Sequence, residues 1–380
     1  MTRVAIAGSG IVSAYGIGRN VLRAGLMSGR PAITPLTRFP LAFADRIKLN
    51  QVDPDLFPEG ETGARAMILA AVDEALADAG LGREALADAA LLVGTSGFLY
   101  LAEYEYRKTF AATGEPSSPP LRGAGRMADR IAAALGVTGP VLTLSTACAS
   151  SANALLVGAD LIRRGRVKRA LVIGAEGLSA ISLTGFESLM LLDPEGCRPF
   201  DAGRAGLQLG EGVAALLLEA DRAGARLALA GGANRCDIHH VTSASPGGEA
   251  MAAVIGDALA DAGLTAADIV AVKAHGTGSE DSDLAEAAAL KRVFGARPPP
   301  FTAIKRYIGH TLGACGAMEL TALVACVESG RLPPAAGFGT PDPALGIAPL
   351  TDFHPLGAGH TLLNFFGFGG NYAALVVRHD

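Results

Sequence analysis

The stretch EALADAGLGREALADAALLVGTSG, residues 74–97, is repeated in outline by DALADAGLTAADIVAVKAHGTGS, residues 257–279. Both stretches are typical of a helix that ends at a glycine, a short acidic turn, and an apolar strand that runs into a Gly-Thr loop. A second pair follows in the same order: GEGVAALLLE at 210–219 and GGNYAALVVR at 369–378, each a glycine turn opening an apolar strand. A shared Ala/Leu/Asp helix alone would be weak evidence, but two ordered repeats indicate an internal duplication.

The duplication divides the chain near residues 219–224 into an N-terminal half, 1–221, and a C-terminal half, 222–380. Strands and helices alternate in each half, which predicts an α/β fold with mostly parallel sheets covered by helices. Ligands bind such sheets beyond the carboxyl ends of the strands, so functional side chains are expected in strand-to-helix loops. Loops are also expected at the proline-rich patches 116–120, 298–300 and 333–334.

The composition and charge argue against several classes of protein, including nucleic-acid-binding, membrane and metal-binding proteins. The chain has 380 residues and a net charge of −5, so no overall positive field attracts nucleic acid or an anionic membrane. No uninterrupted apolar run approaches the roughly 20 residues of a membrane helix, and the N-terminal VAIAG reads as a strand and not as a signal peptide. Five scattered cysteines without zinc spacing predict a reduced, cytoplasmic protein with no metal site. GSGIVS at 8–13 lacks the third glycine of a dinucleotide fingerprint, so no nucleotide site is expected.

Cys148 lies within VLTLSTACASSANALLVGADLIRRG, where an apolar strand over 141–144 meets a helix predicted over 149–162. Free backbone N–H groups and the dipole at the helix N-terminus favour a thiolate, and the small neighbouring residues leave room for a substrate. A lone cysteine is more often a buried core residue, so Cys148 becomes a candidate nucleophile only together with other motifs.

Two further segments carry polar residues near strand ends. His275 ends the apolar strand in VKAHGTGSEDSDLAEAAAL, a place suited to acid–base or hydrogen-bond chemistry, although a packing role is as common. In FTAIKRYIGHTLGACGAMEL, Lys305 follows a strand predicted over 301–304, and His310 precedes a helix that carries Glu319. A buried lysine or glutamate is costly alone, so Lys305 and Glu319 are expected to pair. Read alone, this segment is better explained by an ordinary surface lysine, a histidine at a helix start and a solvated glutamate.

Aromatic residues and glycines alternate in LLNFFGFGGNYAALVV, at Phe366, Gly367, Phe368 and Gly369. The alternation predicts a flexible loop with bulky tips beside a strand, where backbone N–H groups can face an oxyanion. A plain hairpin turn between core strands is the alternative. Each motif is weak alone, but a cysteine from one half with two histidines and a lysine from the other indicate a composite site.

With these motifs in order, the chain resembles the β-ketoacyl synthases of the thiolase superfamily, specifically the elongating Cys-His-His type. The matching motifs are TACAS, RPFDAGRAGLQLGEG, AHGTGSEDSDLAE, K-x3-GH-x2-GA-x-GA and NFFGFGG, and the likeness spans essentially the whole chain. The resemblance implies a thiolase-like fold, with two duplicated α/β halves stacked as five layers, α-β-α-β-α. It also implies an acyltransferase that joins an acyl thioester to malonyl–acyl carrier protein by decarboxylative Claisen condensation, in fatty acid or polyketide chain elongation.

The resemblance assigns catalytic roles to matching residues. Cys148 would carry the acyl chain. His275 and His310 would hydrogen-bond the malonyl thioester and stabilise the enolate formed as carbon dioxide leaves. Lys305 and Glu319 would orient the histidines. The second histidine, in place of the second cysteine of thiolases, favours condensation over thiolytic cleavage.

The resemblance also assigns residues that bind the substrate. The backbone N–H groups of Cys148 and Phe368 would form the oxyanion hole. Phe366 and Phe368, with Gly367 and Gly369 between and after them, would form a gate behind the acyl chain. Thr277 and Ser279 would bind the phosphopantetheine arm of an acyl carrier protein.

No cofactor of its own is implied, because the carrier protein supplies the phosphopantetheine. A homodimer, or a heterodimer with a related ketosynthase subunit, is implied through the strand at 141–146. Alternatives are a chain-length-determining partner subunit with little activity, and a scaffold protein. Arg163 to Arg169 is the most basic run, and it reads equally as a carrier-docking patch or a solvated helix end.

The chain departs from the family pattern at Ala205 and Leu207, at Tyr372, and at Cys315, where alanine is usual, so its substrate is expected to differ from that of housekeeping fatty-acid synthesis.

Overall fold

The computed structural model describes residues 2–115 and 125–380. The prolines at 116, 119 and 120, which were expected in a loop, lie outside the described residues. The N-terminal half contains β1 (Val4–Ser13), β2 (Gly16–Ile17), α1 (Arg19–Ser28), a 3-10 turn (Ala44–Arg46), α2 (Gly60–Ala79), a 3-10 turn (Arg83–Leu86), β3 (Ala90–Gly94), α3 (Leu99–Thr113), α4 (Gly125–Leu135), β4 (Val141–Leu144), α5 (Ser150–Arg163), β5 (Arg169–Glu176), α6 (Ala180–Ser188) and β6 (Gly212–Ala220).

The second half repeats the alternation of strands and helices. The division expected at 221/222 lies in the turn between the last strand of the first half and the first strand of the second. The C-terminal half contains β7 (Leu227–Cys236), α7 (Glu249–Ala262), a 3-10 turn (Ala266–Asp268), β8 (Ile269–Lys273), α8 (Glu280–Phe294), β9 (Phe301–Thr302), α9 (Lys305–Ile308), a 3-10 turn (Leu312–Ala314), α10 (Cys315–Ser329), β10 (Arg331–Leu332), β11 (His354–Pro355), β12 (Gly359–Phe366), a 3-10 turn (Phe368–Gly370) and β13 (Asn371–His379).

The two halves have the same strand order. The first half runs β4-β3-β5-β6-β1 and the second β9-β8-β12-β13-β7. Counting only these five strands in each half, both orders read third, second, fourth, fifth, first in chain order. Off this order, β2 pairs with β1, and β10 and β11 form a separate two-stranded sheet. The halves join where β1 pairs with β7 through Val4–Leu229 and Ala5–Ala228. The shared order confirms the duplication inferred from the repeats.

The prediction of mostly parallel sheets is wrong. β3 runs parallel to β4 and β5, but β6 runs antiparallel to both β5 and β1. The second half has the same mixture, because β8 is parallel to β9 and β12 while β13 is antiparallel to β12 and β7. Only four residues, 367–370, connect β12 to β13, and so short a connection requires an antiparallel pair.

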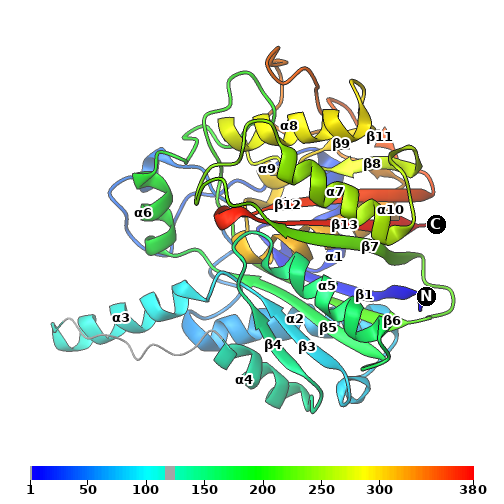
Figure 1. Ribbon diagram of the computed structural model, residues 1–380. Helices are drawn as coiled ribbons and strands as arrows, with labels where there is room; N and C mark the ends of the chain where they lie inside the picture. The colour runs from blue at the N-terminus through cyan, green and yellow to red at the C-terminus, as the bar shows by residue number, and fades with distance from the viewer. Residues whose placement is uncertain (1, 116–124) are drawn as a thin grey trace.

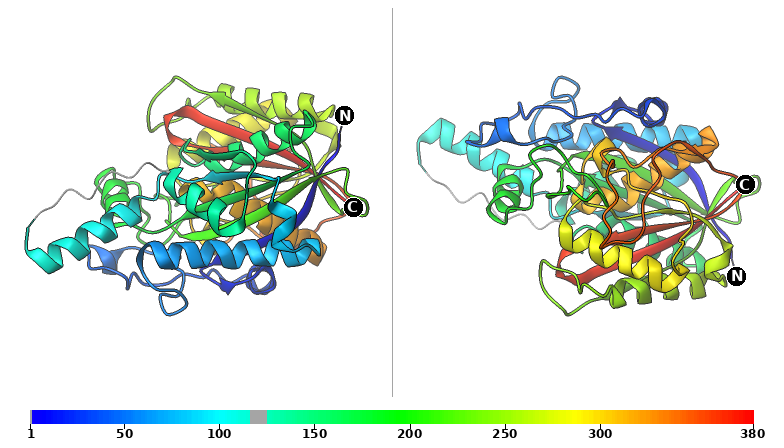
Figure 2. Two further views of the ribbon diagram at one scale, coloured as in Figure 1. Left: turned by 90° about the horizontal axis from the view of Figure 1, so that it is seen from below. Right: turned by 90° about the horizontal axis from the view of Figure 1, so that it is seen from above.

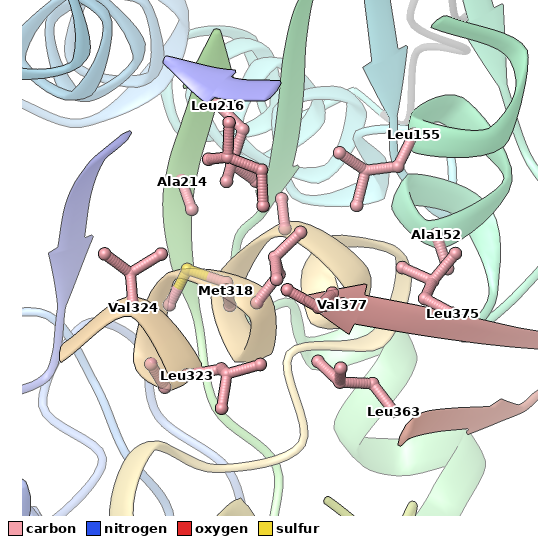
Figure 3. Packing of buried hydrophobic residues seen from close by; sticks show 14 of the residues in the cluster. Ala152, Leu155, Ala214, Leu216, Met318, Leu323, Val324, Leu363, Leu375 and Val377 are labelled. Atoms are coloured by element: carbon pink, nitrogen blue, oxygen red, sulfur yellow. The ribbon is translucent and has the colours of Figure 1, made fainter. Parts of the chain in front are cut away.

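The elements stack as five layers, α-β-α-β-α, as expected (Figure 1). α5 and α10 lie between the two parts of the sheet, α2 and α4 cover the outer face of the first half, and α7 and α8 cover the second. Figure 3 shows the middle layer, where Leu155 of α5 and Met318 of α10 pack with Leu216 of β6 and Leu375 of β13. α3 extends away from the layers (Figure 2).

One stretch of the described chain, Leu312–Ser329, has the length and mean hydropathy of a membrane span, and 83% of it is buried inside the fold. Glu319 and Glu328 interrupt this stretch, so it is not the uninterrupted apolar run that the sequence excludes. It is the central core helix α10, because both parts of the sheet and α5 pack around it. Such burial is typical of a core helix in an α/β fold of this size.

The glycines of GSGIVS serve packing. A Cβ on Gly8 would lie 2.1 Å from the carbonyl oxygen of Ala75, and one on Gly10 the same distance from that of Ala71. The absence of these side chains lets α2 lie directly on β1. The whole of GSGIVS lies within β1 and forms no turn.

Candidate active site

Cys148 lies on the tight turn between β4 and α5. Ala147 before it has a φ of 50°, in the left-handed region that residues other than glycine seldom adopt. The hydroxyl of Ser150 stabilises the turn by donating to the carbonyl of Ala147 at 2.6 Å and accepting from the N–H of Thr146 at 2.8 Å. The strand–turn–helix placement predicted for Cys148 is therefore present, with α5 beginning one residue later than expected.

The side chain of Cys148 is buried and 6% exposed. Burial raises the pKa of Cys148 to about 11, although Lys305 and the backbone N–H groups of Phe368 and of Cys148 itself act to lower it. The expected thiolate is therefore wrong for the resting site, where Cys148 is a thiol at neutral pH. Removal from water outweighs the favourable helix terminus.

The turn between β12 and β13 meets the nucleophile turn. A Cβ on Gly367 would lie 3.0 Å from the backbone nitrogen of Cys148 and 3.3 Å from that of Ala149, closer than real Cβ contacts usually are. The backbone N–H groups of Phe368 and Cys148 lie near the Cys148 sulfur, where they act to lower the pKa of the thiol. Two backbone donors that converge beside a thiol have the arrangement of an oxyanion hole.

His275 and His310 lie edge to face, with 5.6 Å between ring centroids. Both side chains are buried. Burial lowers the pKa of each imidazole well below its usual value, and the positive charges of Lys305 and Lys273 lower it further. Both rings are therefore neutral at pH 7, and each carries one N–H.

The contacts of the rings assign which nitrogen carries that proton. Lys305 Nζ lies 3.3 Å from Nδ1 of His275, and an ammonium can only donate, so Nδ1 accepts and Nε2 holds the proton. For His310, the backbone N–H of Leu312 donates to Nδ1 at 3.3 Å, and the Cys315 sulfur lies 3.1 Å from the same nitrogen. Both histidines thus have an Nε2–H donor.

Lys305 and Glu319 form the predicted pair, with Nζ of Lys305 2.6 Å from Oε1 of Glu319, both 1% exposed. Burial alone lowers the pKa of Lys305, but Glu319 and nearby thiols raise it above its usual value. Glu319 also binds a second buried lysine, Lys273, through Oε2. Lys273 was not expected in the site from the sequence, although a lysine that closes the apolar run IVAVK two residues before His275 was a visible signal.

Two buried carboxylates beneath the His275 loop were also missed. Glu286 accepts from the backbone N–H groups of His275 and Gly276, each at 2.8 Å. Asp283 accepts from those of Thr277 at 3.1 Å and Gly278 at 3.2 Å. The signal was two acidic residues three apart within the small apolar residues of α8. They hold the loop through its main chain.

These elements surround a cavity of about 460 Å³. Its wall contains Cys148, His275 and His310, from three different elements. The other expected site residues divide into two groups. On the cavity wall lie Thr277, Ser279, Phe366, Gly367 and Phe368, whereas Lys305 and Glu319 stand behind the histidines and Gly369 lies in the turn after Phe368.

Three of the five basic residues at and after the end of α5 pair with nearby acids. Arg163 pairs with Asp261, Arg164 with Asp160, and Arg169 with Glu219. These pairs favour a structural helix end over a docking patch. Within residues 2–115 and 125–380, no group of three or more His, Cys, Asp or Glu side chains is arranged to hold a metal ion.

The duplicated five-layer fold, with a thiol, backbone donors and two neutral histidines in one cavity, defines a thiolase-like acyltransferase. Residues 1–224 match the family "Beta-ketoacyl synthase, N-terminal domain", and residues 227–339 match "Beta-ketoacyl synthase, C-terminal domain". The chain therefore belongs to the β-ketoacyl synthase family, whose members carry out condensation.

Curated relatives agree with this assignment. The chain is 32% identical over 413 residues to a putative polyketide beta-ketoacyl synthase 1 of Streptomyces cyaneus, covering 99% of this chain and 97% of the relative. It is 32% identical over 412 residues to the tetracenomycin polyketide synthase ketoacyl synthase alpha subunit of Streptomyces glaucescens, covering 99% and 96%.

Solved structures show the same fold. The ishigamide ketosynthase/chain length factor matches with a TM-score of 0.90 and 29% identity, over 100% of this chain and 99% of that one. A chain from a type II polyketide synthase acyl-carrier protein in complex with its ketosynthase matches with a TM-score of 0.89 and 25% identity, again over 100% and 99%.

Proposed function

We propose that this chain is an active β-ketoacyl synthase in which Cys148 is the nucleophile of a decarboxylative condensation. The observation that carries the proposal is that one cavity brings Cys148 together with two neutral histidines, each with an Nε2–H donor. A subunit that only set the chain length of a partner's product would need neither the thiol nor these donors.

In the first step, the Cys148 sulfur attacks the carbonyl carbon of an acyl thioester on the phosphopantetheine of a carrier protein. The N–H groups of Cys148 and Phe368 hold the oxyanion of the tetrahedral intermediate. The C–S bond to the phosphopantetheine breaks, the departing sulfur ends as a thiol with the proton that Cys148 loses, and the acyl group stays on Cys148.

In the second step, a malonyl thioester replaces the spent carrier, and its carbonyl oxygen accepts from His275 and His310. Loss of carbon dioxide leaves the electron pair of the broken C–C bond on the enolate, which the two donors stabilise in a site shielded from water. The enolate carbon attacks the acyl carbonyl as the bond to Cys148 breaks. The thiolate that leaves takes up a proton from solvent and restores the thiol.

Substrate binding follows the cavity wall. Thr277 and Ser279 lie along it with their hydroxyl oxygens 3.0 Å apart, and we assign them to the phosphopantetheine arm. Phe366 and Phe368 flank Gly367, with the Phe368 ring centroid 5.8 Å from that of Phe186, and we assign them to the gate behind the acyl chain. The group that carries the substrates belongs to the carrier protein, so we propose no cofactor for the enzyme itself.

We further propose a dimer, with a second copy or a related ketosynthase subunit, in the cytoplasm. β4 ends the strand order of the described sheet, pairs with β3 along one edge, and exposes 44% of Leu142. A strand with a free edge and an exposed apolar side chain is suited to pairing across an interface. The second candidate function, a chain-length-determining subunit, is favoured by the likeness to a ketosynthase/chain length factor.

Intact-mass analysis tests the proposal. The purified protein is incubated with acyl-carrier protein and then with malonyl-carrier protein, beside Cys148→Ala and, as a matched control, Cys236→Ala at an exposed thiol. We expect an acyl adduct on the native chain and on Cys236→Ala, none on Cys148→Ala, and a β-keto product in the first two. A native chain that never acylates, or an adduct that persists in Cys148→Ala, contradicts the proposal. Activity that appears only after a second synthase-like chain is added supports the second candidate.

A further inference from the structure

Lys273 closes β8, two residues before His275, and its side chain is 3% exposed. Its ammonium binds Oε2 of Glu319, donates to the main-chain oxygen of Asn364 at 2.9 Å, and lies 4.0 Å from the centroid of the Phe365 ring. A carboxylate, a carbonyl and an aromatic face satisfy the three N–H directions of an ammonium. The ammonium of Lys273 therefore has a partner in each of its three N–H directions.

The pairing of Glu319 does not require this second lysine. Lys305 already neutralises Glu319 through its other oxygen. Burying an additional ammonium has a desolvation penalty, and an apolar residue of similar size at such a position is often neutral or stabilising. The cluster of Lys273, Lys305 and Glu319 thus has two lysines for one carboxylate, with Glu286 as a further carboxylate nearby. Burial lowers the pKa of Lys273, whereas Glu319 and Glu286 act to raise it.

Lys273 reaches His275 along two routes. Through Glu319 it is joined to Lys305, which lies on Nδ1 of the His275 ring. Through Asn364, whose side-chain amide donates to Glu286 at 3.0 Å, it is joined to the carboxylate that holds the backbone N–H of His275. One route fixes the ring and the other fixes the main chain.

We propose that Lys273 is a positioning residue for decarboxylation, which holds Glu319, Lys305 and His275 in register and places a positive charge near the histidine pair. The proposal rests on the function proposed above, because it concerns the half-reaction assigned to His275 and His310. Removal of the charge should affect that half-reaction and spare acyl transfer to Cys148.

The charged and titratable groups around His275 come from every neighbouring element. Lys305 of α9 lies on its Nδ1, with Glu319 of α10 behind it, and Glu286 of α8 binds its backbone. His310 faces its ring, and Cys148 lies across the cavity. Burial and Lys305 lower the pKa of both His275 and His310 most. The positive charge of Lys273 lowers both further, after the effect of His310 in the case of His275.

The test compares Lys273→Met, which keeps the length of the side chain, with Lys273→Gln, which keeps a donor for Glu319 and Asn364 but loses the charge. Lys168→Met, at an exposed lysine before β5, is the matched control. We expect the acid limb of malonyl-carrier decarboxylation to move up by about one pH unit in both Lys273 variants, because removing a nearby positive charge raises the imidazole pKa. Acylation of Cys148 and the Lys168→Met profile should stay within twofold of the native protein.

Histidine NMR gives a second readout that needs no activity. With 13C-labelled histidine, the His275 and His310 signals should titrate at higher pH in both Lys273 variants, and the same variants should keep the native unfolding midpoint or exceed it. If the acid limb and the histidine titrations coincide with those of the native protein, the proposal is overturned. If Lys273→Met does not fold, Lys273→Gln decides between the same two outcomes. A native chain without an adduct on Cys148 instead refutes the proposed function, and the NMR titration still tests the effect of the charge.

Discussion

The two sides of the cavity work by different physical means. On the nucleophile side, Cys148 is flanked by Ala147 and Ala149, and its polar partners are backbone N–H groups placed by a left-handed residue and by the close approach of Gly367. On the histidine side, His275 rests on a buried cluster of charged side chains that includes Lys305 and Glu319. Backbone geometry shapes one side, and buried charge shapes the other.

Because the two sides differ in this way, we expect substitutions on one side to impair acyl transfer and substitutions on the other to impair decarboxylation, each without the other. Substitutions that disturb backbone approach should impair acyl transfer and leave the histidines neutral. Substitutions that unbalance the buried charges should impair decarboxylation, folding stability, or both. Each prediction below tests this separation on one side of the cavity.

The largest effect is expected at Glu319. Glu319→Gln leaves Lys273 and Lys305 without their shared carboxylate, and breaking a buried ion pair in this way costs about 3–5 kcal/mol of folding free energy. The matched control is Glu328→Gln on the same helix, where the partner pair with Arg19 is part-exposed and worth less than about 1 kcal/mol. Urea unfolding of both variants measures the difference, and equal losses would show that the buried cluster is no more important than a surface pair.

Next in size is Gly367→Ala, on the opposite side. The new Cβ would press on the backbone nitrogen of Cys148 and widen the oxyanion hole, and loss of one such donor lowers the rate by about 100-fold. We expect that loss in the rate of Cys148 acylation by intact mass, with unchanged histidine titrations. Gly357→Ala, where a Cβ meets nothing within 4 Å, is the control. A shift in the imidazole pKa of Gly367→Ala would contradict the separation of the two sides.

The sequence was sufficient for one kind of feature and insufficient for the other. The repeats at 74–97 and 257–279 predicted the duplicated halves, because helix ends and apolar strands are determined by residues that are close together in the sequence. The resemblance assigned Cys148, His275 and His310, and the structure brings them to one cavity. Local order also revealed the turn at Cys148, since a strand, small residues and a helix follow one another directly.

The position of Lys273 in the buried charged cluster could not be predicted from local sequence. Lys273 meets Glu319, 46 residues away, and the main chain of Asn364, 91 residues away, so its surroundings depend on how β8, α10 and β12 pack. The same limitation explains the error about the Cys148 thiolate. A helix N-terminus is visible in sequence, whereas desolvation depends on what the whole fold places around the sulfur.

The resting protonation state of Cys148 gives the third prediction. Burial raises its pKa to about 11, and the reactive species is the thiolate, so the iodoacetamide alkylation rate should rise about tenfold per pH unit from pH 7 to 10 without a plateau. The experiment uses Cys236→Ser, because Cys236 is exposed and would react in parallel. Alkylation followed by intact mass gives the profile. A plateau below pH 8 would mean that the helix terminus and Lys305 outweigh burial, so that the nucleophile side also works by charge.

The smallest effect is expected at Cys315, on the histidine side. Burial raises the pKa of Cys315 to about 12, so it is a thiol whose S–H can donate to Nδ1 of His310, 3.1 Å from the sulfur. Cys315→Ala removes that donor, but the N–H of Leu312 still donates to the same nitrogen and keeps the proton on Nε2. One hydrogen bond with a remaining substitute is worth about 1 kcal/mol, so decarboxylation should fall about fivefold.

The matched control for Cys315→Ala is Cys326→Ala, a buried cysteine further along α10 whose substitution leaves a similar small cavity away from His310. Decarboxylation of malonyl-carrier protein and acylation of Cys148 are measured for both variants. If the two variants lose decarboxylation equally, the effect comes from packing in α10. If Cys315→Ala also slows acylation, the thiol acts across the cavity, and the nucleophile and histidine sides are coupled. A fivefold loss confined to decarboxylation in Cys315→Ala alone assigns the effect to the Cys315 hydrogen bond on Nδ1 of His310, because no other step uses that ring.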